Sequence, residues 1–294
     1  MEDKTRAHHR LDRLPARRRF DEIECTVSHL LRLPHPALHG RRYGEALLHG
    51  IAARGIAASH VLEIGGGAGH IAEAAWRGDA GPFTQVRWTS LDLSPALLAA
   101  QRRRVLEPSQ PRGPHQRWSG VRADALDLPF TKFTGLVLAN EMIADLPRST
   151  GPLRLVDELA RILTPGSAAV LTEFGGDFEP GPLDLGAHVE WSIDFRALRA
   201  AASDRGFTVT ELPLHELLDA DLSVRCASYT DLWRLRRLTT CDVFAAPAED
   251  VRRRFPLLSR LLALELPEIG SPRWPDATAP GGFAQLFRAL ILRW

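Results

Sequence analysis

The sequence has few of the residues that build disulfide frameworks or zinc sites, and no segment suited to crossing a membrane. Its three cysteines, Cys25, Cys226 and Cys241, are widely spaced and form no C-x-x-C pair. An odd number of scattered cysteines indicates neither a zinc knuckle nor a disulfide framework, so no metal site is predicted. No apolar run reaches membrane-spanning length. The net charge is only +1, so no long-range field attracts nucleic acid or an anionic membrane, and neither is an expected partner.

The N-terminal stretch lacks the features of a secretory signal. It reads MEDKTRAHHR, which is charged and contains no apolar core. With no disulfide framework indicated either, we expect a reducing compartment and a cytoplasmic protein. Hydrophobic residues make up 45% and charged residues 25% of the 294 positions. These values are ordinary for a soluble globular protein that buries a sizeable core.

The most informative stretch is residues 60–69, which read HVLEIGGGAG. Its apolar residues Val61, Leu62 and Ile64 predict a short, buried parallel strand. Four glycines follow, and residues 71–76 then continue with apolar side chains at helical spacing. Strand, glycine turn and helix together are the opening βα unit of a doubly wound sheet, where ligands bind beyond the strand ends.

The spacing of the glycines separates two classes of ligand. The dinucleotide fingerprint is G-x-G-x-x-G, but the position of its last glycine holds His70. Glu63 precedes the first glycine by two residues; it would repel a pyrophosphate and attract a ligand that carries positive charge. The stretch resembles motif I of the class I S-adenosylmethionine methyltransferases. A glycine turn of some other α/β protein is the alternative.

Two further carboxylates follow predicted strands. Asp92 lies near the end of residues 86–93, and Asp124 follows residues 120–123. We expect Asp92 to accept hydrogen bonds from ribose hydroxyls and Asp124 to accept one from the adenine amine. The alternatives are that Asp92 or Ser94 caps the next helix and that Asp124 only ties its own loop. Three carboxylates at successive strand ends suit a neutral adenosine with a cationic tail.

The resemblance to class I methyltransferases implies S-adenosyl-L-methionine as the cofactor. The residues expected to bind it are Glu63, Gly65, Gly66, Gly67, Gly69, Asp92, Leu93, Asp124, Ala125 and Asn140.

Candidate catalytic residues follow the fourth predicted strand, at 135–139. Asn140 and Glu141 come directly after it, where buried polar groups need partners. Glu141 is the candidate for binding and orienting a nucleophile, since a carboxylate pairs with a guanidinium in bidentate fashion. His188 and Glu190 are second candidates, with His188 as a general base. The alternative for both is that they orient a loop.

We predict an α/β fold: a doubly wound, Rossmann-like sheet of seven strands of the class I methyltransferase type, with an N-terminal helical segment and a helical insertion before the last strand. Residues 283–292 read as a strand or a helix, and the order along the chain favours the strand that closes the sheet. The expected units are a polar tail (1–19), a helical cap (20–58), the S-adenosylmethionine-binding core (59–214), a helical insertion or lid (215–280) and a closing strand (281–294).

Several segments are similar to one branch of this superfamily. They read VLEIGGGAG, SLDLSPALLAAQRRRV, LANEMIADLP, GAHVEWSIDFRALRAAA and PGGFAQLFRAL. Together they resemble the MidA family of protein arginine methyltransferases, which assists assembly of respiratory complex I. The resemblance implies cofactor roles for Glu63, Gly65, Gly67 and Asp92, and substrate roles for Asn140 and Glu141.

The expected function is therefore methyl transfer from S-adenosylmethionine to a nitrogen or oxygen nucleophile. A protein or peptide acceptor is the leading expectation because of the resemblance. One alternative is a natural-product O- or N-methyltransferase that acts on a small molecule. Another is a cofactor-binding assembly factor without catalytic activity. His70 and Glu63 argue against a nicotinamide-dependent dehydrogenase.

Overall fold

The computed structural model describes residues 34, 36–77, 80–106, 117–148, 150–184, 189–221 and 287–294. The predicted polar tail and most of the predicted helical insertion lie outside the described residues. Within the part of the chain that is described, no helix is long and apolar enough to span a membrane.

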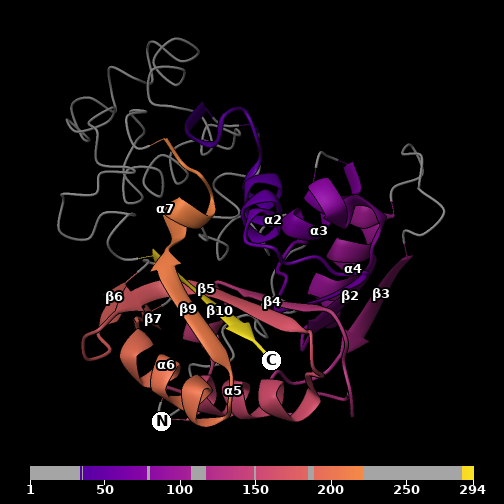
Figure 1. Cartoon of the computed structure of the whole chain (residues 1–294). Coiled ribbons are helices and arrows are strands. Elements are labelled where there is room, and N and C mark those ends of the chain that lie inside the picture. Colours follow the sequence, from indigo (N-terminus) through magenta and orange to yellow (C-terminus); the bar gives the residue numbers. More distant parts are fainter. Residues whose placement is uncertain are drawn as a thin grey trace.

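A mostly parallel sheet forms the centre of the fold (Figure 1). Its strands run in the order β3-β2-β1-β4-β5-β10-β9, and the short strand β8 (Ile193–Asp194) pairs with β5. The other bounds are β1 (His60–Ile64), β2 (Arg87–Asp92), β3 (Arg117–Arg122), β4 (Leu136–Asn140), β5 (Ala168–Gly176), β9 (Thr208–Pro213) and β10 (Phe287–Arg293). The order reverses beside β1, which confirms the doubly wound α/β prediction and places a ligand crevice at the ends of β1 and β4.

The last strand resolves an ambiguity of the sequence. Residues 287–293 form β10, which runs antiparallel between β5 and β9 and joins them. Its central residues Ala289 to Leu292 are fully buried. An apolar run of this length is compatible with strand or helix, and the vacant position between β5 and β9 decides for the strand.

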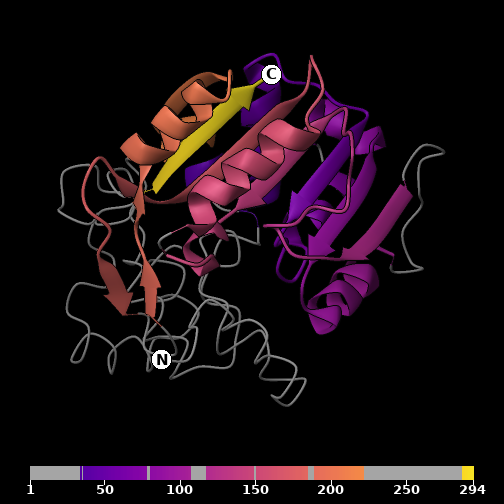
Figure 2. The same ribbon diagram turned by 90° about the horizontal axis from the view of Figure 1, so that it is seen from below.

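Helices cover both faces of the sheet. One face packs against α2 (Tyr43–Ala53), α3 (His70–Arg77), α4 (Pro95–Val105) and α7 (Leu214–Leu217). The other face packs against α5 (Gly151–Ile162) and α6 (Phe195–Asp204), which Figure 2 shows lying across it. Three short 3-10 helices, η2 (Pro36–Leu38), η3 (Gly81–Gln85) and η4 (Ile143–Asp145), join these elements.

Side chains of β1 alternate between the two cores. Val61 packs into the core under α2 and α3, whereas Leu62 and Ile64 pack into the core under α5 and α6. This alternation is the period of two that a strand imposes. Both faces are apolar because both are covered, which explains the continuous hydrophobic run in the sequence.

The sequence did not predict all of the strands correctly. The third strand begins at Arg117 and not at Gly120, because β3 is an exposed edge strand whose side chains carry no hydrophobic pattern. The antiparallel pair of β6 (Pro182–Asp184) with β7 (Val189–Trp191) was not predicted. Strands of three residues are too short to show an alternating pattern.

Close packing at the start of β4 generates a test of the sheet register. Gly135 has φ +147°, and a Cβ added there would lie 2.2 Å from the carbonyl oxygen of His60 in the neighbouring strand. We expect Gly135→Ala to lower the free energy of unfolding by about 3 kcal/mol or more, because steric overlap adds to backbone strain. Chemical denaturation measures the change.

The matched control is Gly166→Ala. Gly166 also has a positive φ, +84°, but an added Cβ would meet no atom within 4 Å. This change should cost only the backbone term of about 1–2 kcal/mol. Equal losses in the two variants would contradict the described packing between β1 and β4.

Candidate functional site

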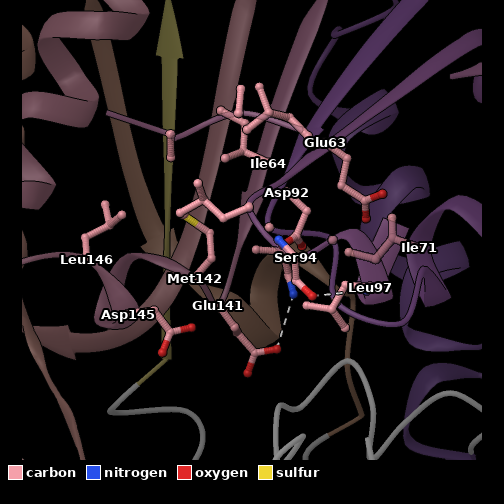
Figure 3. A pocket seen from close by; sticks show the side chains of 18 of the residues that line it. Glu63, Ile64, Ile71, Asp92, Ser94, Leu97, Glu141, Met142, Asp145 and Leu146 are labelled. Atoms are coloured by element: carbon pink, nitrogen blue, oxygen red, sulfur yellow. Dashed lines mark hydrogen bonds between the residues drawn. The ribbon is translucent and has the colours of Figure 1, made fainter. Parts of the chain in front are cut away.

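A pocket lies at the carboxyl ends of β1, β2 and β4, in the crevice that the strand order predicts. It brings together residues from four separate segments of the chain, 63–71, 91–97, 123–125 and 140–146 (Figure 3). Ten predicted site residues line it: Glu63, Gly65, Gly66, Gly67, Asp92, Leu93, Asp124, Ala125, Asn140 and Glu141.

The glycine turn leaves no room for side chains. Gly65 and Gly67 adopt positive φ angles of +66° and +50°. A Cβ on Gly65 would lie 2.8 Å from Cβ of Met142, and one on Gly66 would lie 2.5 Å from the carboxyl carbon of Glu63. The turn therefore needs glycine both for its backbone conformation and for its close approach to neighbours.

Gly69 lies between the pocket and helix α4. It is not among the residues that line the pocket. Its φ is +83°, and a Cβ there would meet the side chain and backbone of Gln101 at about the closest distance that real contacts show, 3.0 Å. Gly69 thus allows α3 to start close against α4, and its predicted contact with the cofactor stays a prediction.

Glu63 lies beneath the glycine turn and is only 1% exposed. Its Oε2 accepts a hydrogen bond of 2.8 Å from the indole N–H of Trp88 and one of 3.5 Å from the hydroxyl of Ser90. Both donors belong to β2, so the carboxylate also ties β1 to its neighbour. A buried carboxylate with hydrogen-bonded partners can remain charged at the floor of the pocket.

Asp92 and Asp124 each hold local backbone as well as lining the pocket. Asp92 Oδ1 accepts from the backbone N–H of Ser94 at 2.8 Å, and Ser94 caps α4 by accepting from Leu97 N at 3.3 Å. Asp124 Oδ1 accepts from Leu126 N at 2.9 Å. The capping by Ser94 is confirmed, and the loop-tying alternative for Asp124 is present. The predicted contacts of both carboxylates with adenosine stay predictions.

Helix α4 holds the outer side of the turn. The fully buried Gln101 donates from Nε2 to the carbonyl oxygen of Gly67 at 2.9 Å. Arg104 donates from Nε to the carbonyl oxygen of Ala68 at 2.8 Å and pairs with Glu73 at 2.9 Å. The sequence analysis did not identify Gln101 or Arg104; the only signal was a polar glutamine within the apolar face of the helix.

Asn140 and Glu141 are joined in a hydrogen-bond network at the end of β4. Asn140 Oδ1 accepts from the hydroxyls of Tyr43 at 2.6 Å and Thr172 at 2.8 Å. Its Nδ2 donates to Glu141 Oε2 at 3.2 Å. The oxygen of Asn140 is thus turned away from Glu141, and its amino group faces the carboxylate. Tyr43 and Thr172 are further site residues that sequence reasoning missed.

Glu141 has a strained backbone. Its φ is +50°, a left-handed conformation that is uncommon for residues other than glycine. Such strain costs about 1–2 kcal/mol and is often found at functional sites. Figure 3 shows the carboxylates of Glu141 and Asp145 at the same end of the pocket, away from Glu63. The pocket therefore has an acidic end distinct from its glycine turn.

The other two catalytic candidates are not placed. His188 lies outside the described residues. Glu190 belongs to β7 by its backbone, but its side chain is also outside the described part of the chain. Their roles as general base or as loop-orienting residues stay predictions.

Residues 62–171 match the family model that is described as a methyltransferase domain. No curated protein matches this chain. Among solved structures, an uncharacterized protein from Burkholderia thailandensis is similar, with a TM-score of 0.51 and 14% identity, covering 99% of this chain and 87% of that chain. This likeness extends over almost the whole chain and supports the fold.

Two further solved structures match the central part of the chain. The glycopeptide N-methyltransferase MtfA, in complex with S-adenosyl-L-methionine, has a TM-score of 0.44 and 20% identity, covering 58% of this chain and 86% of that chain. The N-methyltransferase NodS from Bradyrhizobium japonicum WM9, in complex with S-adenosyl-L-homocysteine, has a TM-score of 0.41 and 20% identity, covering 57% and 76%.

The environment of Tyr43 generates a prediction about pH. Burial, followed by the nearby carboxylate of Glu141, raises the pKa of Tyr43 well above its ordinary value of 10.0. The pKa of Tyr43 is higher in the folded state than in the unfolded state. The contribution of neutral Tyr43 to the free energy of unfolding is therefore complete below pH 10.0 and is lost as the pH rises beyond it. The free energy of unfolding should therefore fall more steeply above pH 10.0 in the wild type than in Tyr43→Phe.

Tyrosinate absorbance provides the control. The chain has two tyrosines, and Tyr229→Phe leaves Tyr43 as the only one. In that variant the absorbance of tyrosinate should rise only together with the loss of folded structure seen by circular dichroism. Ionisation at the ordinary pKa in a still folded protein would contradict the described burial of Tyr43.

Proposed function

We propose that the chain is a class I S-adenosylmethionine-dependent methyltransferase, and that it transfers the methyl group to a nitrogen or oxygen nucleophile oriented by Glu141. The observation that carries the proposal is the single pocket that joins the glycine turn, three carboxylates at strand ends and the strained Glu141. The first two parts suit the cofactor, and the third suits the acceptor.

The chemistry of the pocket fits S-adenosylmethionine better than a nucleotide with phosphates. The described lining residues include Glu63, Asp92 and Asp124 but no lysine or arginine. Carboxylates accept hydrogen bonds from ribose hydroxyls and an adenine amine, and they attract a cationic amino acid tail. A side chain on Gly65 or Gly66 would collide with Met142 or Glu63, so the backbone of the turn stays bare.

S-adenosylmethionine, when bound, supplies an electrophilic methyl group on a sulfonium. The residues of this chain bind and orient the reactants. Glu141 accepts a hydrogen bond from the N–H or O–H of the acceptor and so directs its lone pair, while Asn140 holds the Glu141 carboxylate in place. Fixing nucleophile and methyl group in line can contribute up to roughly 7–11 kcal/mol in ideal cases.

The class of acceptor needs a direct assay. The resemblance to the MidA family favours a protein or peptide, and a small molecule is the rival. Transfer of labelled methyl from the cofactor is measured with protein fractions and with small-molecule extracts in parallel. Transfer to neither, together with retained binding of S-adenosylhomocysteine, would favour the third reading, an assembly factor without catalytic activity.

The cofactor part of the proposal predicts the effect of Asp92→Asn. This change keeps an acceptor for the N–H of Ser94 but removes the charge offered to the ribose. A charge-assisted hydrogen bond contributes about 1.5–3 kcal/mol, so the Kd for S-adenosylhomocysteine should rise about tenfold to a hundredfold. Calorimetric titration measures it.

The control for this titration is Asp204→Asn, at the exposed C-terminal end of α6 and outside the pocket. It should leave the Kd unchanged. NAD is titrated alongside. Tight binding of NAD with no uptake of S-adenosylhomocysteine would overturn the assignment of the pocket.

The acceptor part predicts a loss of turnover in Glu141→Gln with little change in cofactor binding. Removing the charge weakens the hydrogen bond to the nucleophile, so kcat for the acceptor identified above should fall about tenfold or more. The Kd for S-adenosylhomocysteine should stay within about twofold. Glu179→Gln, in the exposed segment after β5, is the matched control, and full turnover in Glu141→Gln would contradict the role of Glu141.

A further inference from the structure

A second cavity of about 190 Å³ lies beside the pocket. Helix η4 and the residue after it separate the two, and Leu146 lines both. The walls come from η4, the first turns of α5 and α6, and the segment from β7 to β8. Leu146 is the only one of these lining residues that also lines the pocket.

The wall contains an exposed arginine, Arg148, that is stacked on an aromatic ring. The guanidinium carbon of Arg148 lies 3.7 Å from the centre of the Trp191 ring. Among the described residues, Arg148 forms neither a hydrogen bond nor an ion pair. A guanidinium stays protonated in proteins and presents a planar fork of donors that matches a carboxylate. Stacking on an indole fixes this fork without using its donors.

The acidic residue of the same wall is already compensated. Asp194 Oδ1 accepts from the backbone N–H of Ala197 at 3.1 Å and so caps α6. Its Oδ2 lies 3.7 Å from the guanidinium of Arg196. The carboxylate of Asp194 therefore does not neutralise Arg148, and the described wall offers a positive site to a ligand.

The remainder of the wall is mostly apolar. It includes Ile143, Leu146, Leu153, Ile193 and Leu198. Cavities of about 150 Å³ lined by such side chains hold benzene, so this one accommodates a group the size of a single substituted ring. An apolar body with an anionic end is the ligand that matches both features.

We propose that this second cavity is the acceptor subsite, and that the acceptor is not the protein or peptide favoured by the MidA resemblance but a small molecule whose ring-sized apolar group lies in the cavity while its carboxylate binds Arg148. The inference rests on the proposed function, because the shared Leu146 places the subsite directly beside the acidic end of the pocket. The carboxylate serves for recognition, and the nitrogen or oxygen that receives the methyl group lies at the other end of the molecule, toward Glu141.

The test uses phenylacetate and phenethylamine as probes of equal ring size and opposite charge. Each is titrated into the full chain, with and without saturating S-adenosylhomocysteine, and binding is followed by ligand-observed NMR. Phenylacetate should bind at least tenfold more tightly than phenethylamine. In Arg148→Gln the Kd for phenylacetate should rise about tenfold or more, whereas the exposed control Arg103→Gln, on α4, should leave it unchanged.

A second variant tests the apolar part of the cavity. Ala197 lies in the first turn of α6 and lines the cavity, so Ala197→Leu fills space without disturbing the helix. It should weaken phenylacetate binding about tenfold while S-adenosylhomocysteine binds as in the wild type.

The outcomes separate the two proposals. An unchanged Kd for phenylacetate in Arg148→Gln, or equally tight binding of phenethylamine, overturns the acceptor subsite and leaves the cofactor assignment in place. Failure of the wild type to bind S-adenosylhomocysteine overturns the proposed function itself. Binding of phenylacetate that depends on Arg148 and on the space beside Ala197 supports the subsite.

Discussion

The site depends on a buried carboxylate that needs donors from the neighbouring strand. Glu63 is 1% exposed beneath the glycine turn, and a charge in that position is costly unless it is hydrogen-bonded. Trp88 and Ser90 supply the donors, and both lie on β2, where Ser90 is the register partner of Glu63. The buried Glu63 therefore depends on the pairing of β1 with β2, which supplies its donors. It also depends on the absence of a side chain at Gly66, which leaves room for its carboxyl group.

Hydrogen bonds from α4 hold the rest of the pocket around the glycine turn. Gln101 and Arg104 bind the carbonyl oxygens of the turn from α4, and α4 is capped by Ser94, whose backbone N–H donates to Asp92. The turn and the ribose-binding candidate are thus positioned by a single helix. A pocket whose parts are held before the ligand arrives loses less conformational entropy on binding, which is how preorganised sites gain affinity.

Local patterns in the sequence predicted the glycine turn and the cap of α4, and long-range contacts limited the rest. The glycine turn, Asp92 and Ser94 lie within short segments whose spacing reports their structure. Tyr43 and Asn140, by contrast, are 97 residues apart, and no pattern in either segment predicts that they form a hydrogen bond. The edge strand β3 and the three-residue strands β6 and β7 escaped prediction because exposed or very short strands carry no hydrophobic signature.

Two sets of hydrogen bonds hold η4 and the residues that precede it at the acidic end of the pocket. Tyr43 and Thr172 saturate the oxygen of Asn140, so its amino group faces the carboxylate of Glu141. The buried Glu173 binds the backbone N–H of Ala144 at 3.0 Å and fixes η4 from the side of β5. Helix η4 is the wall between the pocket and the second cavity. These contacts therefore fix the position of the carboxylates at one end of the pocket. They also fix the position of Arg148 on the far side of that wall. If the second cavity is the proposed acceptor subsite, we expect this arrangement to select an acceptor by its length and by the charge at its far end.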